Sequence, residues 1–323
     1  MTTEQLATPE SSTAHPVIEL INSRLQNGAS SNYQDGAKLA LVIEGGGMRG
    51  VVGGGMVIGM QELGIKPEAF DLVVGSSAGT LTGAYYIAGQ TESGTSIYFE
   101  DLIDRRWLDP RRIAKREPVV GLNYLINEVM VNAKPLAWSN VLESAARLHA
   151  VTTRLPDFST ETLANFSNPE QLRKAMMASA GIPILSGRPV EIDGVQYIDG
   201  AESESIPVRS AISLGATHIL ALLTRPAGKL KSSSSLAERK LLFPAANRMI
   251  RGLGNVQVAK PARYNEEVLA VTSRTTDPTA DPPYIFGVQV PEGTAEIKQL
   301  EQDPEILIAG AQAGRIAIYT ALS

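Results

Sequence analysis

The segment Gly75-Ser76-Ser77-Ala78-Gly79 places two serines between two glycines, directly after an apolar run of strand length. A Gly-x-Ser-x-Gly pattern between a strand and a helix is typical of a nucleophile elbow, a tight turn that exposes the central hydroxyl group. The positive end of the following helix favours negative charge there. The positions of the glycines indicate Ser77 as the nucleophile, because the Ser76 side chain would point elsewhere. For this motif alone, a glycine-rich turn with a serine as helix cap is the alternative.

A second glycine-rich loop follows an earlier strand-like run and consists of Gly45, Gly46, Gly47, Met48, Arg49 and Gly50. Its G-x-G-x-x-G spacing also fits a dinucleotide site, which needs an acidic residue at the end of the next strand. That strand ends instead in the serine motif, and Asp71 lies at its beginning. The loop therefore favours an oxyanion hole, in which each backbone donor stabilises the transition state by about 2.7–4 kcal/mol. We expect the Arg49 side chain to be a solvated turn residue, with a positive charge for the loop as the alternative.

Asp199 is the best candidate for the base that takes the serine proton. The three histidines, His15, His149 and His218, are far apart, and none follows a strand in the way that a triad histidine does. Asp199 leaves a predicted hairpin that turns at Asp193-Gly194, and Gly200 and Ala201 follow it. An aspartate beside a glycine can point into a cleft, although Asp-Gly is also a common turn pair.

Ser179 is a second serine in a small-residue segment, but it does not fit an elbow. Met177 stands where the first glycine of that motif should be. We therefore do not expect Ser179 to be a nucleophile.

The elements around these motifs predict an α/β fold with a mainly parallel sheet. Apolar runs at 38–43 and 70–75 are each followed by a glycine turn and a helix, which is the βαβ pattern. A mostly helical stretch follows at 95–147, another helix is expected at 236–254, and further strands are expected near 149–155, 190–199, 215–224 and 284–291. A final helix covers 303–322.

Composition excludes several classes of site. With no cysteine and three dispersed histidines, disulfides, thiolate catalysis and a histidine-rich metal site are not expected, and we expect no metal and no cofactor. The net charge of −5, from 29 basic and 34 acidic residues, argues against a general nucleic-acid binder. Residues 1–15 lack the pattern of a secretory signal, and no run of about 20 residues is uniformly apolar, so a cytoplasmic protein is expected.

The segment 104–117 contains six basic residues around Trp107. A basic segment with a tryptophan can contact anionic lipid headgroups at a membrane surface. A solvated surface helix and turn is the favoured interpretation, because Asp104, Asp109 and Glu117 compensate part of the charge.

The glycine loop, the serine elbow and the Asp199-Gly200-Ala201 motif, in this order, resemble the patatin-like phospholipase family, in its bacterial branch. The resemblance covers residues 38 to 320, strongly up to 225. It implies a three-layer α/β/α fold with a flexible N-terminal tail and short helix (1–37), a patatin-like catalytic domain (38–225) and a C-terminal extension packed on the same domain (226–323).

The family resemblance also implies a lipid acyl hydrolase of the phospholipase A or lysophospholipase type, active in lipid degradation. Ser77 would form the acyl-enzyme, Asp199 would be the base in a Ser–Asp dyad, and the amides of 45–50 would hold the oxyanion. Because the ordinary pKa of aspartate is about 3.9, burial is expected to raise that of Asp199.

The sequence departs from the pattern of the family at two positions. Ala201 stands where many relatives have glycine, which the family accepts. Ser205 stands where relatives often have asparagine, which weakens any expected support of Asp199 from that position.

The stretch 95–147 is expected to cap the site or to form a cleft for the acyl chain. The alternative function is a catalytically weak patatin-like scaffold that binds lipid or a protein partner.

Overall fold

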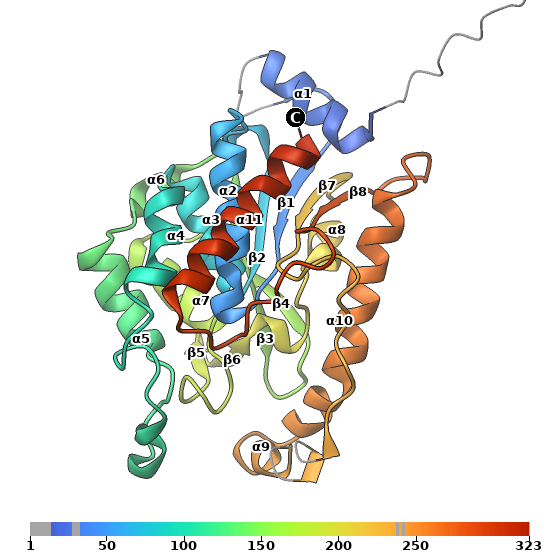
Figure 1. The fold of residues 1–323 in the computed structure, drawn as a ribbon. Coiled ribbons are helices and arrows are strands. Elements are labelled where there is room, and N and C mark those ends of the chain that lie inside the picture. Colours follow the sequence, from blue (N-terminus) through green and yellow to red (C-terminus); the bar gives the residue numbers. More distant parts are fainter. Residues whose placement is uncertain (1–13, 28–32, 237–238, 241–242, 323) are drawn as a thin grey trace, which may run out of the picture.

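The computed structural model describes residues 14–27, 33–236, 239–240 and 243–322 (Figure 1). Within them a single mixed sheet runs in the order β5-β6-β3-β2-β1-β7-β8, with β4 paired to β3. The strands are β1 (Leu39–Ile43), β2 (Leu72–Ser76), β3 (Arg147–Arg154), β4 (Thr160–Leu163), β5 (Val190–Ile192), β6 (Val195–Asp199), β7 (His218–Leu222) and β8 (Tyr284–Val288).

The predicted parallel sheet is confirmed at the centre. Strands β3, β2, β1, β7 and β8 pair in parallel, whereas β4, β5 and β6 join antiparallel at one edge. The helices are α1 (Pro16–Gln26), α2 (Gly50–Glu62), α3 (Ala78–Ile87), α4 (Thr91–Glu100), α5 (Leu122–Tyr124), α6 (Trp138–Glu143), α7 (Pro169–Ser179), α8 (Val208–Ser213), α9 (Phe243–Met249), α10 (Leu253–Thr275) and α11 (Pro304–Leu322).

The sheet is covered on both faces, which confirms the expected three-layer α/β/α fold. Helices α2, α3, α4 and α11 lie on one face, and α8 and α10 on the other (Figure 1). Alternate residues of β1 explain this arrangement, since side chains of a strand point to opposite faces. Leu39, Leu41 and Ile43 belong to the core under α2, whereas Ala40 and Val42 belong to the core under α8 and α10. A strand that is apolar on both faces is typical of a parallel sheet.

The C-terminal part of the chain is built into this architecture. Strand β8 pairs with β7, and α11 packs along α2. The helices approach closely where α2 has small residues: a Cβ atom on Gly55 would lie 1.8 Å from the Ala311 carbonyl oxygen. The boundary expected at 225 stays a prediction, as does the tail expected at 1–37, of which residues 1–13 and 28–32 lie outside the described residues.

The stretch 95–147 is less helical than expected. Helix α4 ends at Glu100, turns follow, and a 3₁₀ segment covers Pro110–Lys115. A π-helix then covers Leu125–Ala133. Polar residues and the β-bridge between Leu108 and Val120 interrupt the helical pattern here.

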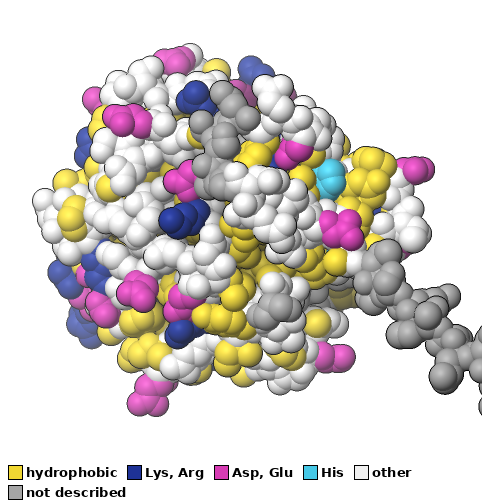
Figure 2. Space-filling model, turned by 90° about the horizontal axis from the view of Figure 1, so that it is seen from above, with side chains coloured by type: hydrophobic (Ala, Val, Ile, Leu, Met, Phe, Trp, Pro, Cys, Tyr) yellow, Lys and Arg dark blue, Asp and Glu magenta, His cyan; other side chains and the backbone are white. Residues whose placement is uncertain are grey.

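The carboxyl ends of the parallel strands lie at the bottom of Figure 1, opposite α1. The α1 end is shown in Figure 2, where basic and acidic side chains are interspersed and hydrophobic ones form a band across the middle. No helix among the described residues is both long and apolar enough to cross a bilayer. The functional motifs lie at the opposite, carboxyl end.

Candidate active site

Ser77 occupies the junction between β2, which ends at Ser76, and α3, which begins at Ala78. Its backbone has φ 54° and ψ −124°, a conformation that costs a residue with a Cβ atom on the order of 1–3 kcal/mol and is concentrated at functional sites. The flanking glycines are required by close packing. A Cβ atom would lie 2.4 Å from the Thr80 nitrogen at Gly75, and 2.2 Å from the Ile43 oxygen at Gly79. The sequence pattern therefore has a direct steric cause.

Asp199 reaches Ser77 because of the register of β3. Ser76 of β2 pairs with Val151, and Asp199 of β6 pairs with the next residue, Thr152. Strand β6 therefore pairs with the part of β3 that directly follows the part paired with β2. The Ser77 Oγ atom donates a hydrogen bond of 2.6 Å to Asp199 Oδ2, and the two residues are only 5% and 3% exposed.

The backbone after Asp199 is fixed by close contacts. A Cβ atom on Gly200 would lie 2.2 Å from the Val151 oxygen, so this position needs glycine. The Ala201 amide donates a 2.8 Å hydrogen bond to Asp199 Oδ1. One carboxylate oxygen is therefore held by the backbone, and the other faces the serine.

Burial raises the pKa of Asp199 to about 6, while the positive charge of Lys260 and the hydrogen bond from Ser77 favour the ionised form. The carboxylate is thus mostly ionised at neutral pH and is a far stronger base than an exposed aspartate. Efficient general bases have a pKa near the working pH.

Ser179 lies beneath the elbow, a role that its sequence context did not reveal. Its Oγ accepts a 3.1 Å hydrogen bond from the Ser77 amide, donates one of 2.6 Å to the Val151 oxygen, and lies 2.8 Å from Thr80 Oγ1. Ser179 therefore holds the backbone of Ser77, and its own hydroxyl group is engaged by these contacts. Ser179 lies about 100 residues after Ser77 in the sequence, so no local sequence pattern indicates the contact between them.

Within the described residues, the glycine loop has two backbone amides without a hydrogen-bond acceptor. Four of its amides donate within the protein: those of Gly45, Met48, Arg49 and Gly50 bond to the carbonyl oxygens of Ser205, Gln299, Gly46 and Gly47, respectively. In the described part of the chain, the Gly46 and Gly47 amides have no such acceptor. The loop touches the elbow, since a Cβ atom on Gly45 would lie 2.9 Å from that of Ser77.

The expectation that Arg49 is a solvated turn residue is wrong. The side chain is 5% exposed, its Nε donates to Thr224 Oγ1 at 3.2 Å, and it forms an ion pair of 3.8 Å with Glu296. Thr224 follows the end of β7, and Glu296 lies in the C-terminal part, so both partners are far from Arg49 in the sequence. The sequence alone therefore gave no sign of this burial.

Other candidates lie away from the hydroxyl. Ser76 Oγ donates to the Glu204 oxygen at 2.8 Å, on the far side of the turn. His218 begins β7 and His15 caps α1, both at the end of the sheet opposite Ser77, and His149 pairs with Val74 inside the sheet. Among the described residues, no group of three or more His, Asp or Glu is arranged to hold a metal ion.

Two cavities meet at Ser77. The apolar pocket is lined by residues of α3, α4 and the stretch 95–147, among them Leu81, Tyr98, Leu102, Trp107, Leu125 and Met130. The polar cavity is lined by Gly46, Gly47, Arg49, Asp199, Lys231 and Lys260, among others. Trp107, placed by sequence in a surface segment, is buried in the wall of the apolar pocket.

Several known proteins are similar to this chain. A family model described as Patatin-like phospholipase matches residues 41–212. The Escherichia coli K12 protein YjjU, described as uncharacterized, is 27% identical over 60% of this chain and 54% of its own length. Human patatin-like phospholipase domain-containing protein 2 is 25% identical over 42% of this chain and 26% of its own length. The chain therefore spans about half of the first relative and a quarter of the second.

Among solved structures, VipD from Legionella pneumophila has a TM-score of 0.47 and 12% sequence identity, over 88% of this chain and 66% of that chain. The family match is the stronger finding, because it includes the glycine loop, the elbow and Asp199 and covers more than half of the 323 residues. The chain belongs to the patatin-like phospholipase family.

Proposed function

We propose that this protein is a lipid acyl hydrolase that cleaves carboxylic esters through an acyl-enzyme on Ser77. The observation that carries the proposal is the buried 2.6 Å hydrogen bond from Ser77 Oγ to Asp199 Oδ2. An isolated aspartate is a weak base, but direct contact and a raised pKa together make proton transfer feasible at neutral pH.

The reaction follows from the positions of these groups. Asp199 takes the proton as Ser77 Oγ attacks the ester carbon, and the Gly46 and Gly47 amides stabilise the negative charge on the carbonyl oxygen. The C–O bond to the alcohol then breaks, and the alcohol leaves with the proton from Asp199. Water, deprotonated by the same aspartate, releases the fatty acid and regenerates Ser77.

The apolar pocket supports a lipid acyl group as the substrate. Ser77 lines it together with Ala78, Leu81 and residues from the stretch 95–147. Aliphatic and aromatic walls stabilise a bound acyl chain by about 25 cal/mol for each Å² of apolar surface removed from water. No step of this mechanism needs a metal or an organic cofactor.

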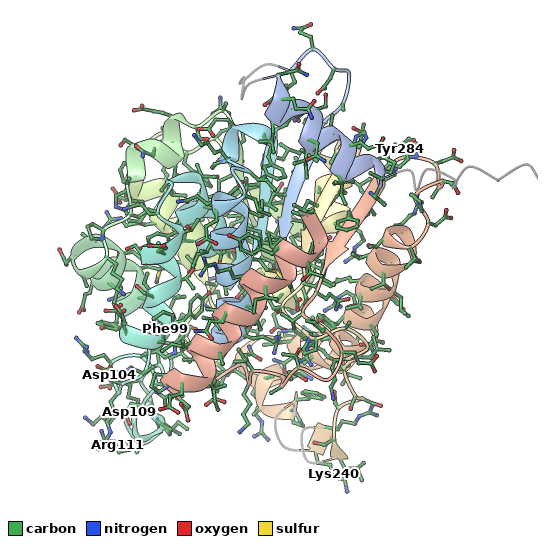
Figure 3. The ribbon with its side chains drawn as sticks, turned by 45° about the horizontal axis from the view of Figure 1, so that its top comes forward. Phe99, Asp104, Asp109, Arg111, Lys240 and Tyr284 are labelled. Carbon is green, nitrogen blue, oxygen red and sulfur yellow. The ribbon has the colours of Figure 1, made fainter. Side chains whose placement is uncertain are left out.

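Contact with a membrane surface is proposed for the segment 104–117. It protrudes at the same end of the molecule as Ser77, and Figure 3 shows Asp104, Asp109 and Arg111 at its outer edge. The carboxylates pair with Arg106 and Arg111, which leaves other exposed cations of the segment to contact anionic lipid. Ile113, 67% exposed, adds an apolar group.

Hydrolysis of p-nitrophenyl esters over a series of acyl lengths tests the proposal. Ser77→Ala and Asp199→Asn are expected to reduce kcat to background, and His218→Ala is the matched control that retains activity. A fluorophosphonate probe should label the wild type and not Ser77→Ala. A folded wild type that neither hydrolyses esters nor reacts with the probe would favour the alternative of a catalytically weak scaffold that binds lipid or a protein partner.

A further inference from the structure

Among the described residues, one of the cations that line the polar cavity beside Ser77 has no direct ion pair. Three basic residues line it: Arg49, Lys231 and Lys260. Lys260 Nζ forms a 2.8 Å ion pair with Glu202, and Arg49 pairs with Glu296. Among the ion pairs of the described residues, none involves Lys231. Lys231 is therefore the lining cation without a direct carboxylate partner in the described part of the chain, with only the longer-range attraction of Glu44.

Helix α10 holds Lys231 in place. The Lys231 amide donates to Asn265 Oδ1 at 2.7 Å, and its carbonyl accepts from Asn265 Nδ2 at 3.0 Å. Its Nζ lies 4.0 Å from the centre of the Tyr264 ring, a cation–π contact. A loop residue clamped through both backbone groups has little freedom left to lose on binding, which is how a preorganised site gains affinity.

The surroundings of Lys231 favour the arrival of an anion. Burial lowers its pKa to about 7, and Lys260, Arg49 and Arg225 act in the same direction, opposed by Glu44. A bound negative charge would favour the protonated ammonium and relieve the repulsion among these cations.

The chemistry of the proposed hydrolysis decides which part of the substrate enters this cavity. Asp199 lines the polar cavity and not the apolar pocket. Since the base returns its proton to the leaving oxygen, the alcohol side of the ester must lie next to Asp199. The acyl chain then occupies the apolar pocket, and the alcohol occupies the polar cavity.

We propose that Lys231 binds an anionic phosphate group on the alcohol side of the scissile ester and so selects phosphate-bearing acyl esters over uncharged ones. Lysine is a common point-charge ligand of phosphate in proteins. This inference rests on the hydrolase function proposed above and adds a specificity residue to it. Lys231 lies beyond residues 41–212, so this selection would come from the chain's own C-terminal part and not from the family motifs.

Two substrates that differ only in the phosphate test the inference: 1-palmitoylglycerol 3-phosphate and 1-palmitoylglycerol, each in the same neutral detergent micelles. Lys231→Met should lower kcat/KM for the phosphate ester about 10- to 100-fold, as expected for a lost hydrogen bond to a charged group. It should change kcat/KM for the glycerol ester by less than about 2-fold. Lys231→Arg should retain most of the preference, and Lys229→Met, at an exposed position two residues away, is the matched control.

Equal losses on both substrates, or no loss on either, would overturn the role of Lys231 while leaving the hydrolase proposal intact. Binding in the Ser77→Ala background, followed by tryptophan fluorescence, provides a readout without turnover. There, Lys231→Met should weaken binding of the phosphate lipid alone, and unchanged binding would also overturn the inference.

Inorganic phosphate as a competitor distinguishes the two possible sources of the group. Competition in the wild type that Lys231→Met abolishes would mean that the cavity recognises phosphate by itself. Selection between the lipids without such competition would mean that Lys231 binds phosphate only as part of a lipid. A wild type that hydrolyses neither ester and does not react with a fluorophosphonate, yet binds the phosphate lipid through Lys231, would reject the hydrolase proposal alone.

Discussion

Asp199 must be ionised to accept the proton of Ser77, and its burial opposes ionisation. Because the pKa is raised to about 6, the fraction of ionised base falls as the pH drops through 6. We expect kcat/KM for a soluble p-nitrophenyl ester to show an acidic limb with an apparent pKa near 6. The profile should be measured from pH 4 to 8 with Ser77→Ala as the blank. A limb near pH 4 would mean that the carboxyl group titrates as if exposed.

The same shift predicts that Asp199, the proposed base, destabilises the fold at neutral pH. A carboxyl group whose pKa is higher in the folded protein favours folding when protonated, and this contribution is lost as the pH rises through 6. Asp199→Asn should therefore raise the free energy of unfolding at pH 8 by about 1–3 kcal/mol. The gain should disappear near pH 4. Urea unfolding at the two pH values measures it, and a variant that is less stable at pH 8 would contradict the prediction.

Residues at the site differ in how far the sequence alone could identify them. Ser77 and Asp199 were predicted because steric demands fix glycines beside them, and those glycines leave a local pattern. Ser179, Arg49 and Lys231 have no such pattern, since their roles depend on partners more than 60 residues away or on a cavity wall. Contacts of this kind follow from the tertiary fold and not from spacing.

At the level of elements, the glycines of α2 differ sharply in the space around them: Gly55 faces α11, whereas Gly53 faces Ile43 and Thr224. A Cβ atom on Gly55 would lie 1.8 Å from the Ala311 oxygen, whereas on Gly53 its nearest neighbour would be 3.6 Å away. Gly55→Ala should lower the free energy of unfolding by about 1–3 kcal/mol or more, through overpacking. Gly53→Ala should raise it by about 0.5–1 kcal/mol, because alanine favours a helix. Thermal melts of both variants test this, and equal effects would mean that α11 is not packed here.

The helices and strands were predicted best where the apolar pattern of the sequence is continuous. The strand–glycine–helix repeats of β1, α2, β2 and α3 follow from apolar runs and close packing, and they gave the parallel sheet. The turns after Glu100 were missed, whereas the segment Leu125–Ala133 is helical as expected but takes the π form. The predicted helix at 236–254 is described only in part, as α9 and the start of α10.

At the scale of the whole molecule, the parallel strands bring the glycine loop, the elbow and both cavities to one end. Two segments protrude at that end, 104–117 and the part around α9 that carries Lys240 (Figures 1 and 3). Their exposed apolar side chains include Ile113, Leu236 and Met249. An ester in a lipid surface would meet this end of the protein first, whereas the α1 end has charges of both signs interspersed (Figure 2).

This polarity of the molecule predicts binding to vesicles that depends on charge at one end only. Lys115 and Arg116 are exposed in the protruding segment, and Lys66 and Arg147 are exposed at the opposite end. Each cation near an anionic surface contributes about 1 kcal/mol, so Lys115→Gln with Arg116→Gln should weaken binding to phosphatidylglycerol vesicles about 10- to 30-fold. Lys66→Gln with Arg147→Gln changes the net charge equally and should have little effect. Cosedimentation at low and high salt measures both. Equal losses in the two double variants would indicate attraction by net charge alone, and insensitivity of the wild type to salt and to anionic lipid would reject the membrane contact.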